Sequence, residues 1–202
     1  MEFVLSAAIS YLIGSISFSY LIAKKLAGID IRAHGSGNAG ATNTLRVLGK
    51  GPAIVVLVLD MLKGMAAMQI AWYLSGGSTV AVAFAGIFAI IGHNWPVFFQ
   101  FRGGKGIATT LGVALMLSWK AFVVSGILCL LVILVTRYVS LGSLVFVTAL
   151  PVTLWIFTGD AALFGVSLFV TLLGYVRHYS NIRNLLAGKE RKLGDPSSRP
   201  LK

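Results

Sequence analysis

The sequence predicts an all-α integral membrane protein with seven transmembrane helices. Only 11% of its 202 residues are charged and 57% are hydrophobic, whereas a soluble domain has about 25% charged residues. The hydrophobic residues fall into runs close to the roughly 20 residues that a membrane-spanning helix needs. Basic residues gather between these runs in a pattern that sets the N-terminus outside and the C-terminus in the cytoplasm. The composition argues against a soluble globule, a disordered chain, a collagen and a coiled coil.

The expected spans fill most of the chain and leave only short loops between them. Residues 1–202 are therefore predicted to form a single membrane-embedded domain. The spans are Phe3–Ala23, Pro52–Leu74, Thr79–Phe99, Ile107–Trp119, Ala121–Thr136, Val139–Phe157 and Ala161–Val176.

The stretch 107–136 is interpreted as two helices because Lys120 lies in its middle. One helix of that length would reach about 45 Å, across a hydrocarbon core of about 30 Å. With two helices, 15 of the 17 Lys and Arg residues fall on the cytoplasmic side, while Lys120 lies outside and Lys63 within a span. One helix would move the basic C-terminal segment outside, against the positive-inside rule.

Three polar stretches fall on the predicted cytoplasmic face, and the first lies between Arg32 and Arg46. Its glycines permit positive φ and close backbone approach, and successive N–H groups in such a loop can bind an anion. The guanidinium of Arg46 suits phosphate. A flexible linker is the alternative, although linkers rarely mix Asn, Thr, His and Arg so densely. The residues assigned to this anion site are Gly35, Ser36, Gly37, Asn38, Gly40, Thr42, Asn43 and Arg46.

The second stretch runs from residue 92 to residue 106, just before an expected helix. Three glycines around one lysine at a helix N-terminus predict a phosphate cradle. The spacing differs from a Walker A loop, so an ATPase is not favoured. The alternative is a tight turn that carries two cations for topology. Candidate binding residues are His93, Asn94, Arg102, Gly103, Gly104, Lys105 and Gly106.

The third stretch follows the last span. Helical spacing is expected to put His178 and Asn181 on one face, with Glu190 and Lys192 farther along as supporting residues. A basic segment that binds anionic lipid headgroups is the alternative. It explains the cations but not the histidine and the asparagine.

Asp60 and Lys63 are charged residues one helical turn apart within the second span. Intramembrane charges are functional candidates by default. Their spacing equally allows a buried structural ion pair, and both interpretations stand.

The sequence offers no residues with the spacing of a metal site and no nucleophile-elbow motif with a Ser-His-Asp set. No metal or other cofactor is therefore expected. The net charge of +11 fits an anionic membrane surface or anionic substrates better than nucleic acid, for which the chain has no soluble platform.

Taken together, the three stretches resemble the bacterial membrane acyl-phosphate:glycerol-3-phosphate acyltransferases of the PlsY type. The resemblance covers the whole chain in length, number of spans and order of motifs. The matching segments are Gly35–Asn38, Gly40–Asn43 and Arg46, then Gly92–Pro96 and Arg102–Gly106, then His178, Asn181–Ile182 and Gly188–Glu190.

The resemblance implies an enzyme of the bacterial cytoplasmic (inner) membrane whose active site faces the cytoplasm. It would transfer an acyl group from acyl-phosphate to glycerol 3-phosphate without metal, giving lysophosphatidic acid and phosphate, and would not use acyl-CoA or acyl carrier protein as the direct donor. By the same resemblance the catalytic residues are Ser36, Arg46, His178 and Asn181, the loop Gly103–Gly106 binds substrate phosphate, and Glu190 braces the site. The alternative function is a small organic-phosphate or anion transporter, whose polar groups would be expected near the bilayer midplane.

Overall fold

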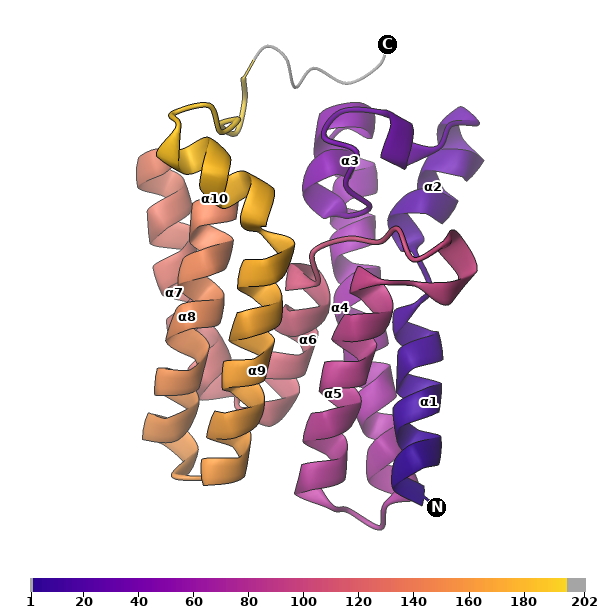
Figure 1. Ribbon diagram of the computed structural model, residues 1–202, viewed down its shortest axis with the longest axis vertical. Helices are drawn as coiled ribbons and strands as arrows, with labels where there is room; N and C mark the ends of the chain where they lie inside the picture. Colours follow the sequence, from indigo (N-terminus) through magenta and orange to yellow (C-terminus); the bar gives the residue numbers. More distant parts are fainter. Residues whose placement is uncertain (1, 196–202) are drawn as a thin grey trace. The chain divides into compact units, whose positions relative to one another are not determined.

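The computed structural model describes residues 2–195, and the secondary structure in this part of the chain is entirely helical (Figure 1). The chain divides into two compact units with a boundary between Val113 and Ala114. Unit 1 comprises the described residues before this boundary, and unit 2 comprises Ala114–Asp195.

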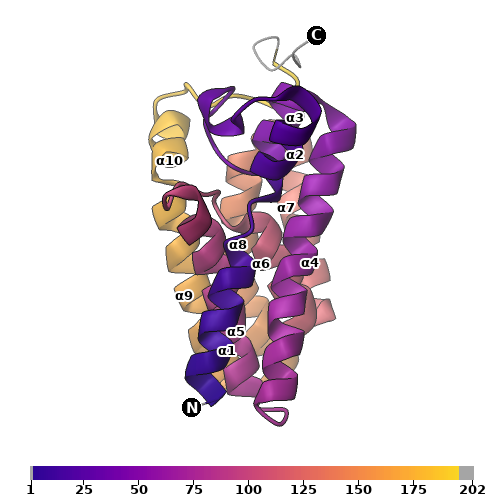
Figure 2. The same cartoon turned by 90° about the vertical axis from the view of Figure 1, so that its right-hand side faces the viewer.

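Unit 1 is built around three long helices, which pack against one another near the N-terminus of the chain (Figures 1 and 2). Short helices and two loops lie at the end of unit 1 opposite the N-terminus (Figure 1). In chain order the elements are α1 (Glu2–Gly14), α2 (Phe18–Ala27), the 3₁₀ turn η1 (Ile31–Ala33), α3 (Ala41–Leu48), α4 (Lys50–Leu74), α5 (Thr79–Asn94), η2 (Val97–Phe99) and the start of α6 (Ile107–Leu117).

Small residues let α1 and α5 approach closely, as is common in membrane bundles. A Cβ on Gly14 would overlap the backbone of Ala89, and one on Gly92 would overlap the carbonyl oxygen of Tyr11. The Tyr11 hydroxyl donates to the carbonyl of Trp95 at 2.8 Å. The end of α5, which leads into the second polar stretch, is therefore held against α1.

The first predicted span, Phe3–Ala23, lies within the candidate span Glu2–Ala27, which is built from two helices rather than one. Residues 15–17 separate α1 from α2. Inside a membrane, a broken helix is tolerated only where protein groups satisfy its backbone. Here the Lys63 ammonium donates to the Ile16 carbonyl at 2.6 Å, and the Ser15 hydroxyl donates to the Tyr11 carbonyl at 2.8 Å.

Unit 2 contains the end of α6 followed by α7 (Trp119–Thr136), α8 (Val139–Thr158), α9 (Ala161–Arg177) and α10 (Tyr179–Leu186). Within unit 2, α8 packs against both α7 and α9. Hydroxyl groups join these helices in the apolar interior. Ser125 and Thr153 bond at 2.9 Å between α7 and α8, and Thr171 donates to the Val147 carbonyl at 2.6 Å between α9 and α8.

Each of the seven predicted spans is mostly helical, and among the described residues five candidates are long and apolar enough to cross a membrane by themselves. Those five are Glu2–Ala27, Lys50–Leu74, Thr79–Phe99, Trp119–Thr136 and Val139–Thr158. The stretch 107–136 is two helices, as predicted, and the Ser118 hydroxyl caps the second by accepting from the Ala121 N–H at 3.3 Å. α6 has 11 residues, and α9 passes the same test only together with α10, from which it is bent by 62°.

Candidate functional site

The first loop, residues 34–43, is held by one buried side chain. The carboxamide of Asn43 accepts from the Ser36 N–H at 2.8 Å and donates to the carbonyls of Ile31 and His34 at 3.1 and 3.0 Å. Gly35 adopts φ +62°, and a Cβ there would overlap the Asn43 oxygen. The loop therefore has a defined conformation that requires glycine at this position, which argues against a flexible linker.

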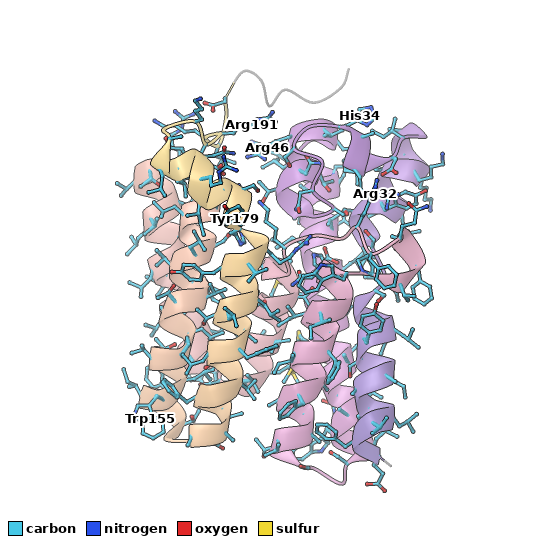
Figure 3. The ribbon with its side chains drawn as sticks, viewed as in Figure 1. Arg32, His34, Arg46, Trp155, Tyr179 and Arg191 are labelled. Carbon is cyan, nitrogen blue, oxygen red and sulfur yellow. The ribbon has the colours of Figure 1, made fainter. Side chains whose placement is uncertain are left out.

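The remaining predicted residues of the first stretch lie around this loop or on α3. Gly37 has φ +73°, Ser36 is exposed and Asn38 is half-buried. Gly40 begins α3 with extended backbone, and its carbonyl accepts from the Thr44 hydroxyl at 3.1 Å. Thr42 and Arg46 are half-buried on α3. Figure 3 shows Arg46 at the loop end of unit 1.

A pair that the sequence analysis did not single out joins the two polar stretches of unit 1. Asp30 and Arg32 form an ion pair at 2.8 Å, and Arg32 also donates to the carbonyl of Phe99 at 2.8 Å. The hydrogen bond from Arg32 lowers the pKa of Asp30 below its ordinary value, and the same bond raises the pKa of Arg32. Arg32 lies 5.1 Å above the ring of Tyr20, which contacts the Phe99 ring at 4.9 Å.

The second loop, residues 95–106, begins with a tight turn. Gln100 and Phe101 both have φ +58°, a conformation that is rare for a residue with a side chain and costs about 1–3 kcal/mol where it occurs. The N–H groups of Phe99 and Phe101 both donate to the Pro96 carbonyl, at 3.1 and 3.0 Å. Exposed Arg102 follows this turn. Such strain persists only where the surrounding structure fixes it.

The glycines of the second loop lie against the end of α5 and the first loop. The Gly104 N–H donates to the His93 carbonyl at 3.1 Å. A Cβ on Gly103 would overlap that carbonyl, and a Cβ on Gly104 would overlap both Nε2 of His93 and the carbonyl oxygen of Ala39. Ala39 belongs to the first loop, so the two predicted glycine loops meet here.

The second loop ends at the N-terminus of α6. Gly106 has φ +81°, and a Cβ there would lie 2.8 Å from the Asn94 oxygen. Asn94 is completely buried, and its carboxamide makes no hydrogen bond within the described residues. Half-buried Lys105 lies immediately before Gly106. A buried amide and a helix N-terminus therefore adjoin the predicted phosphate loop.

Asp60 and Lys63 form the ion pair that their spacing allowed, with 2.8 Å between Oδ1 and Nζ and nearly no exposure of either side chain. Lys63 also lies 3.0 Å from Nδ1 of His93. The sequence suggested the Asp60–Lys63 pair and, separately, His93, but not that the three residues form one buried cluster.

The third polar stretch lies wholly in unit 2, where His178 is the N-cap of α10, three residues before Asn181, and its carbonyl accepts from the Ile182 N–H at 2.8 Å. α9 ends at Arg177, and α10 leaves it at an angle of 62°. Buried His178 lies at the bend, with Nδ1 2.8 Å from the Gly174 carbonyl. Asn181 donates from α10 to Glu190 at 2.7 Å, and Glu190 also accepts from the Ser140 hydroxyl of α8 at 2.7 Å.

The segment after α10 is held to the turn between α7 and α8. Arg137 donates two hydrogen bonds to the Leu193 carbonyl, at 2.7 and 3.1 Å. Lys192 lies 5.5 Å above the ring of Tyr138. Figure 3 shows Tyr179 and Arg191 at this end of unit 2, with Trp155 at the other. Neither Ser140 nor Arg137 belongs to a sequence motif, and only the fold shows that they contact this segment.

The chain is similar to known proteins over most of its length. Residues 4–188 match the family model described as glycerol-3-phosphate acyltransferase. A glycerol-3-phosphate acyltransferase of Halalkalibacterium halodurans is 55% identical over 92% of both chains. One of Shouchella clausii is 50% identical over 91% of this chain and 92% of its own.

Solved structures give the same result. The crystal structure of PlsY, an integral membrane glycerol 3-phosphate acyltransferase, in its glycerol 3-phosphate form has a TM-score of 0.90 to this chain, with 38% identity and 96% coverage of both chains. The lysophosphatidic acid form has a TM-score of 0.88, with 36% identity and 98% coverage of both. The chain therefore belongs to the glycerol-3-phosphate acyltransferase family of integral membrane enzymes.

Proposed function

We propose that this enzyme transfers a fatty acyl group from acyl-phosphate to the 1-hydroxyl of glycerol 3-phosphate, giving lysophosphatidic acid and inorganic phosphate for phospholipid synthesis. The observation that carries the proposal is the contact between the first and second loops at Ala39 and Gly104. Two adjacent loops rich in backbone N–H groups suit a reaction in which both substrates bear phosphate. The glycerol 3-phosphate and lysophosphatidic acid forms of PlsY provide independent support.

The proposed chemistry needs little from the protein beyond positioning and charge stabilisation. The glycerol hydroxyl attacks the acyl carbonyl, the bond from that carbon to the phosphate oxygen breaks, and phosphate leaves. Acyl-phosphate is a reactive mixed anhydride, so orientation of the two substrates and stabilisation of developing negative charge account for catalysis. Ser36 and Arg46 are assigned to that charge, while Gly103–Gly106 with Asn94 are assigned to a substrate phosphate.

His178 and Asn181 complete the proposed catalytic set. The Gly174 carbonyl 2.8 Å from Nδ1 of His178 can only accept, so Nδ1 carries a proton and the ring is held at the bend. We assign His178 as acceptor of the glycerol hydroxyl proton, a role for which a substrate phosphate oxygen is the alternative. Glu190 fixes Asn181, and we assign it and Lys192 to support of the site.

Asn43 is reassigned from substrate binding to support of the first loop. Its carboxamide already makes three hydrogen bonds within the loop and its surroundings. The other residues proposed to contact substrate in the two loops are Gly35, Gly37, Asn38, Gly40, Thr42, His93 and Arg102.

We further propose that the whole chain acts as one membrane-embedded domain with seven crossings in the cytoplasmic membrane, its N-terminus outside and its active site facing the cytoplasm. The distribution of Lys and Arg supports this orientation. The α6 and α7 helices then form two separate crossings, and the short α6 is accommodated by tilt or local thinning of the bilayer.

The test is the reaction itself, with purified protein in lipid vesicles, acyl-phosphate and labelled glycerol 3-phosphate. We expect labelled lysophosphatidic acid and an equal amount of phosphate, without added metal or coenzyme A. Product formed only with acyl-CoA or acyl carrier protein would overturn the proposed donor. Uptake of label into the vesicle lumen without product would identify a transporter instead.

A further inference from the structure

Asp60 and Lys63 have no task in the reaction proposed above, and they form a buried cluster with His93. The Lys63 ammonium group lies 2.8 Å from Asp60, 2.6 Å from the Ile16 carbonyl and 3.0 Å from Nδ1 of His93. A protonated lysine has three N–H donors and no acceptor. The ion-pair partner lies on α4 itself, and the two hydrogen-bond partners lie in the break between α1 and α2 and at the end of α5.

These contacts determine where the proton of His93 resides. Lys63 forms an ion pair with the Asp60 carboxylate, and the ammonium of such a pair can only donate. Nδ1 of His93 must then accept, so a neutral ring carries its proton on Nε2. Asp60 lies 3.5 Å from Nδ1, a distance at the outer limit for a hydrogen bond. Lys63, rather than Asp60, is thus the group that orients the ring.

The protonated nitrogen points to the contact between the two loops. A Cβ on Gly104 would overlap Nε2 of His93 and the Ala39 carbonyl, so both atoms face the same point on the second loop. The backbone of His93 contacts this loop as well, through the hydrogen bond from the Gly104 N–H to its carbonyl. One buried residue therefore touches the second loop through both ring and backbone, next to an acceptor of the first loop.

We propose that Asp60 and Lys63 are positioning residues: Lys63 fixes the His93 tautomer with its proton on Nε2, and His93 so oriented sets the second loop against the first. The consequence for substrate binding rests on the proposed function, because it requires the second loop to bind phosphate. The tautomer itself does not depend on that assignment. If the pair had a purely structural role, limited to satisfying the Ile16 carbonyl, its removal would leave the His93 tautomer unchanged.

The direct test is the ¹⁵N spectrum of histidine-labelled protein in lipid bilayers, since the chain has only three histidines and a His93→Gln sample identifies the His93 signals. We expect wild-type His93 to have an unprotonated Nδ1 and a protonated Nε2. A proton on Nδ1 would overturn the proposal whether or not any variant folds.

The variant test uses Asp60→Asn combined with Lys63→Met, which removes both charges together. We expect the His93 signals to change to a mixture of tautomers. We also expect the KM for a phosphate substrate to rise at least tenfold, with a smaller change in kcat. In Lys63→Arg, which keeps the positive charge, the KM should rise less. Lys120→Met, which removes an exposed lysine of α7, is the matched control and should change neither readout.

The outcomes separate this inference from the proposed function. An unchanged His93 spectrum in the folded double variant would overturn the inference. The expected spectra in a protein that makes no lysophosphatidic acid from acyl-phosphate would instead support the tautomer and refute the proposed reaction.

Discussion

Gly104→Ala tests the second loop most directly, because the structure shows what the added methyl group would meet. A Cβ there would overlap Nε2 of His93 and the Ala39 carbonyl. Neither atom can easily withdraw, since Lys63 holds the His93 ring and Ala39 is buried. The loop must therefore move away from one or both. Forcing a methyl group into such a packed site typically costs about 1–3 kcal/mol.

We expect this displacement to weaken substrate binding. If the free energy of substrate binding becomes less favourable by about 1–3 kcal/mol, the KM for a phosphate substrate rises by roughly 5- to 150-fold. A loop that holds phosphate equally in the ground state and the transition state contributes uniform binding, whose loss raises KM and leaves kcat largely unchanged. Lys105→Ala should give the same pattern through loss of the cation.

The assay is steady-state kinetics in lipid vesicles, with acyl-phosphate and glycerol 3-phosphate varied in turn. Gly126→Ala is the matched control, because a Cβ there would meet nothing within 4 Å and alanine is favourable in a helix. It should leave both constants unchanged. A lowered kcat with unchanged KM for both substrates in Gly104→Ala would refute the assignment of this loop to phosphate binding.

Three further predictions concern the first loop, the topology and the third polar stretch. Ser36→Ala should lower kcat by about 100- to 1000-fold, the usual effect of losing one donor to developing negative charge, without loss of folded protein; Arg46→Lys should recover only part of the activity lost in Arg46→Ala, because an ammonium lacks the planar fork of a guanidinium. Near wild-type turnover in Ser36→Ala would contradict the role of Ser36, and wild-type activity in Arg46→Lys would contradict the role of the guanidinium. Cysteines at Ser75 and Lys192, in a background without the native cysteine, should react with impermeant reagents from opposite sides of intact cells, and reaction from one side would refute the topology. Glu190→Ala should lower the free energy of unfolding by about 1.5–3 kcal/mol per charged hydrogen bond lost, measured by thermal unfolding in detergent, and Glu190→Gln should lose less; equal stability of all three proteins would contradict the bracing role.

Much of the fold is predictable because the membrane restricts what a chain can do. Runs of apolar residues must be helices, and the distribution of cations indicates their orientation. The interruption after Gly14 was missed because two serines and an isoleucine hardly alter the average hydropathy of the span. A glycine followed by two serines within three positions was the available signal, since small polar residues mark places where a membrane helix can open and be paired by its neighbours.

The candidate site was predictable in composition but not in its contacts. Glycine spacing indicated two anion-binding loops. In the first, Gly35 and Gly37 have the positive φ that glycine permits, whereas Gly40 is extended. Sequence alone does not show that Asn43 is wholly buried and organises the loop, because an asparagine in a polar stretch is more often exposed. The bond from Arg32 to Phe99 joins residues 67 positions apart, and no local pattern encodes it. Likewise, Ser140 has no feature that separates it from other serines of the spans until the fold sets it beside Glu190.

The ion pair of α4 also bears on how the polypeptide enters the bilayer during synthesis. When α4 leaves the ribosome, the chain that will form α5 and supply His93 is still inside the ribosomal tunnel. A lone charged residue at the centre of a newly inserting helix costs about 2.5–3.5 kcal/mol. Asp60 and Lys63 are three residues apart on one helix, so they can neutralise each other before any later segment arrives. The spacing that organises the mature cluster therefore also lets its charges pass through the translocation machinery as a pair.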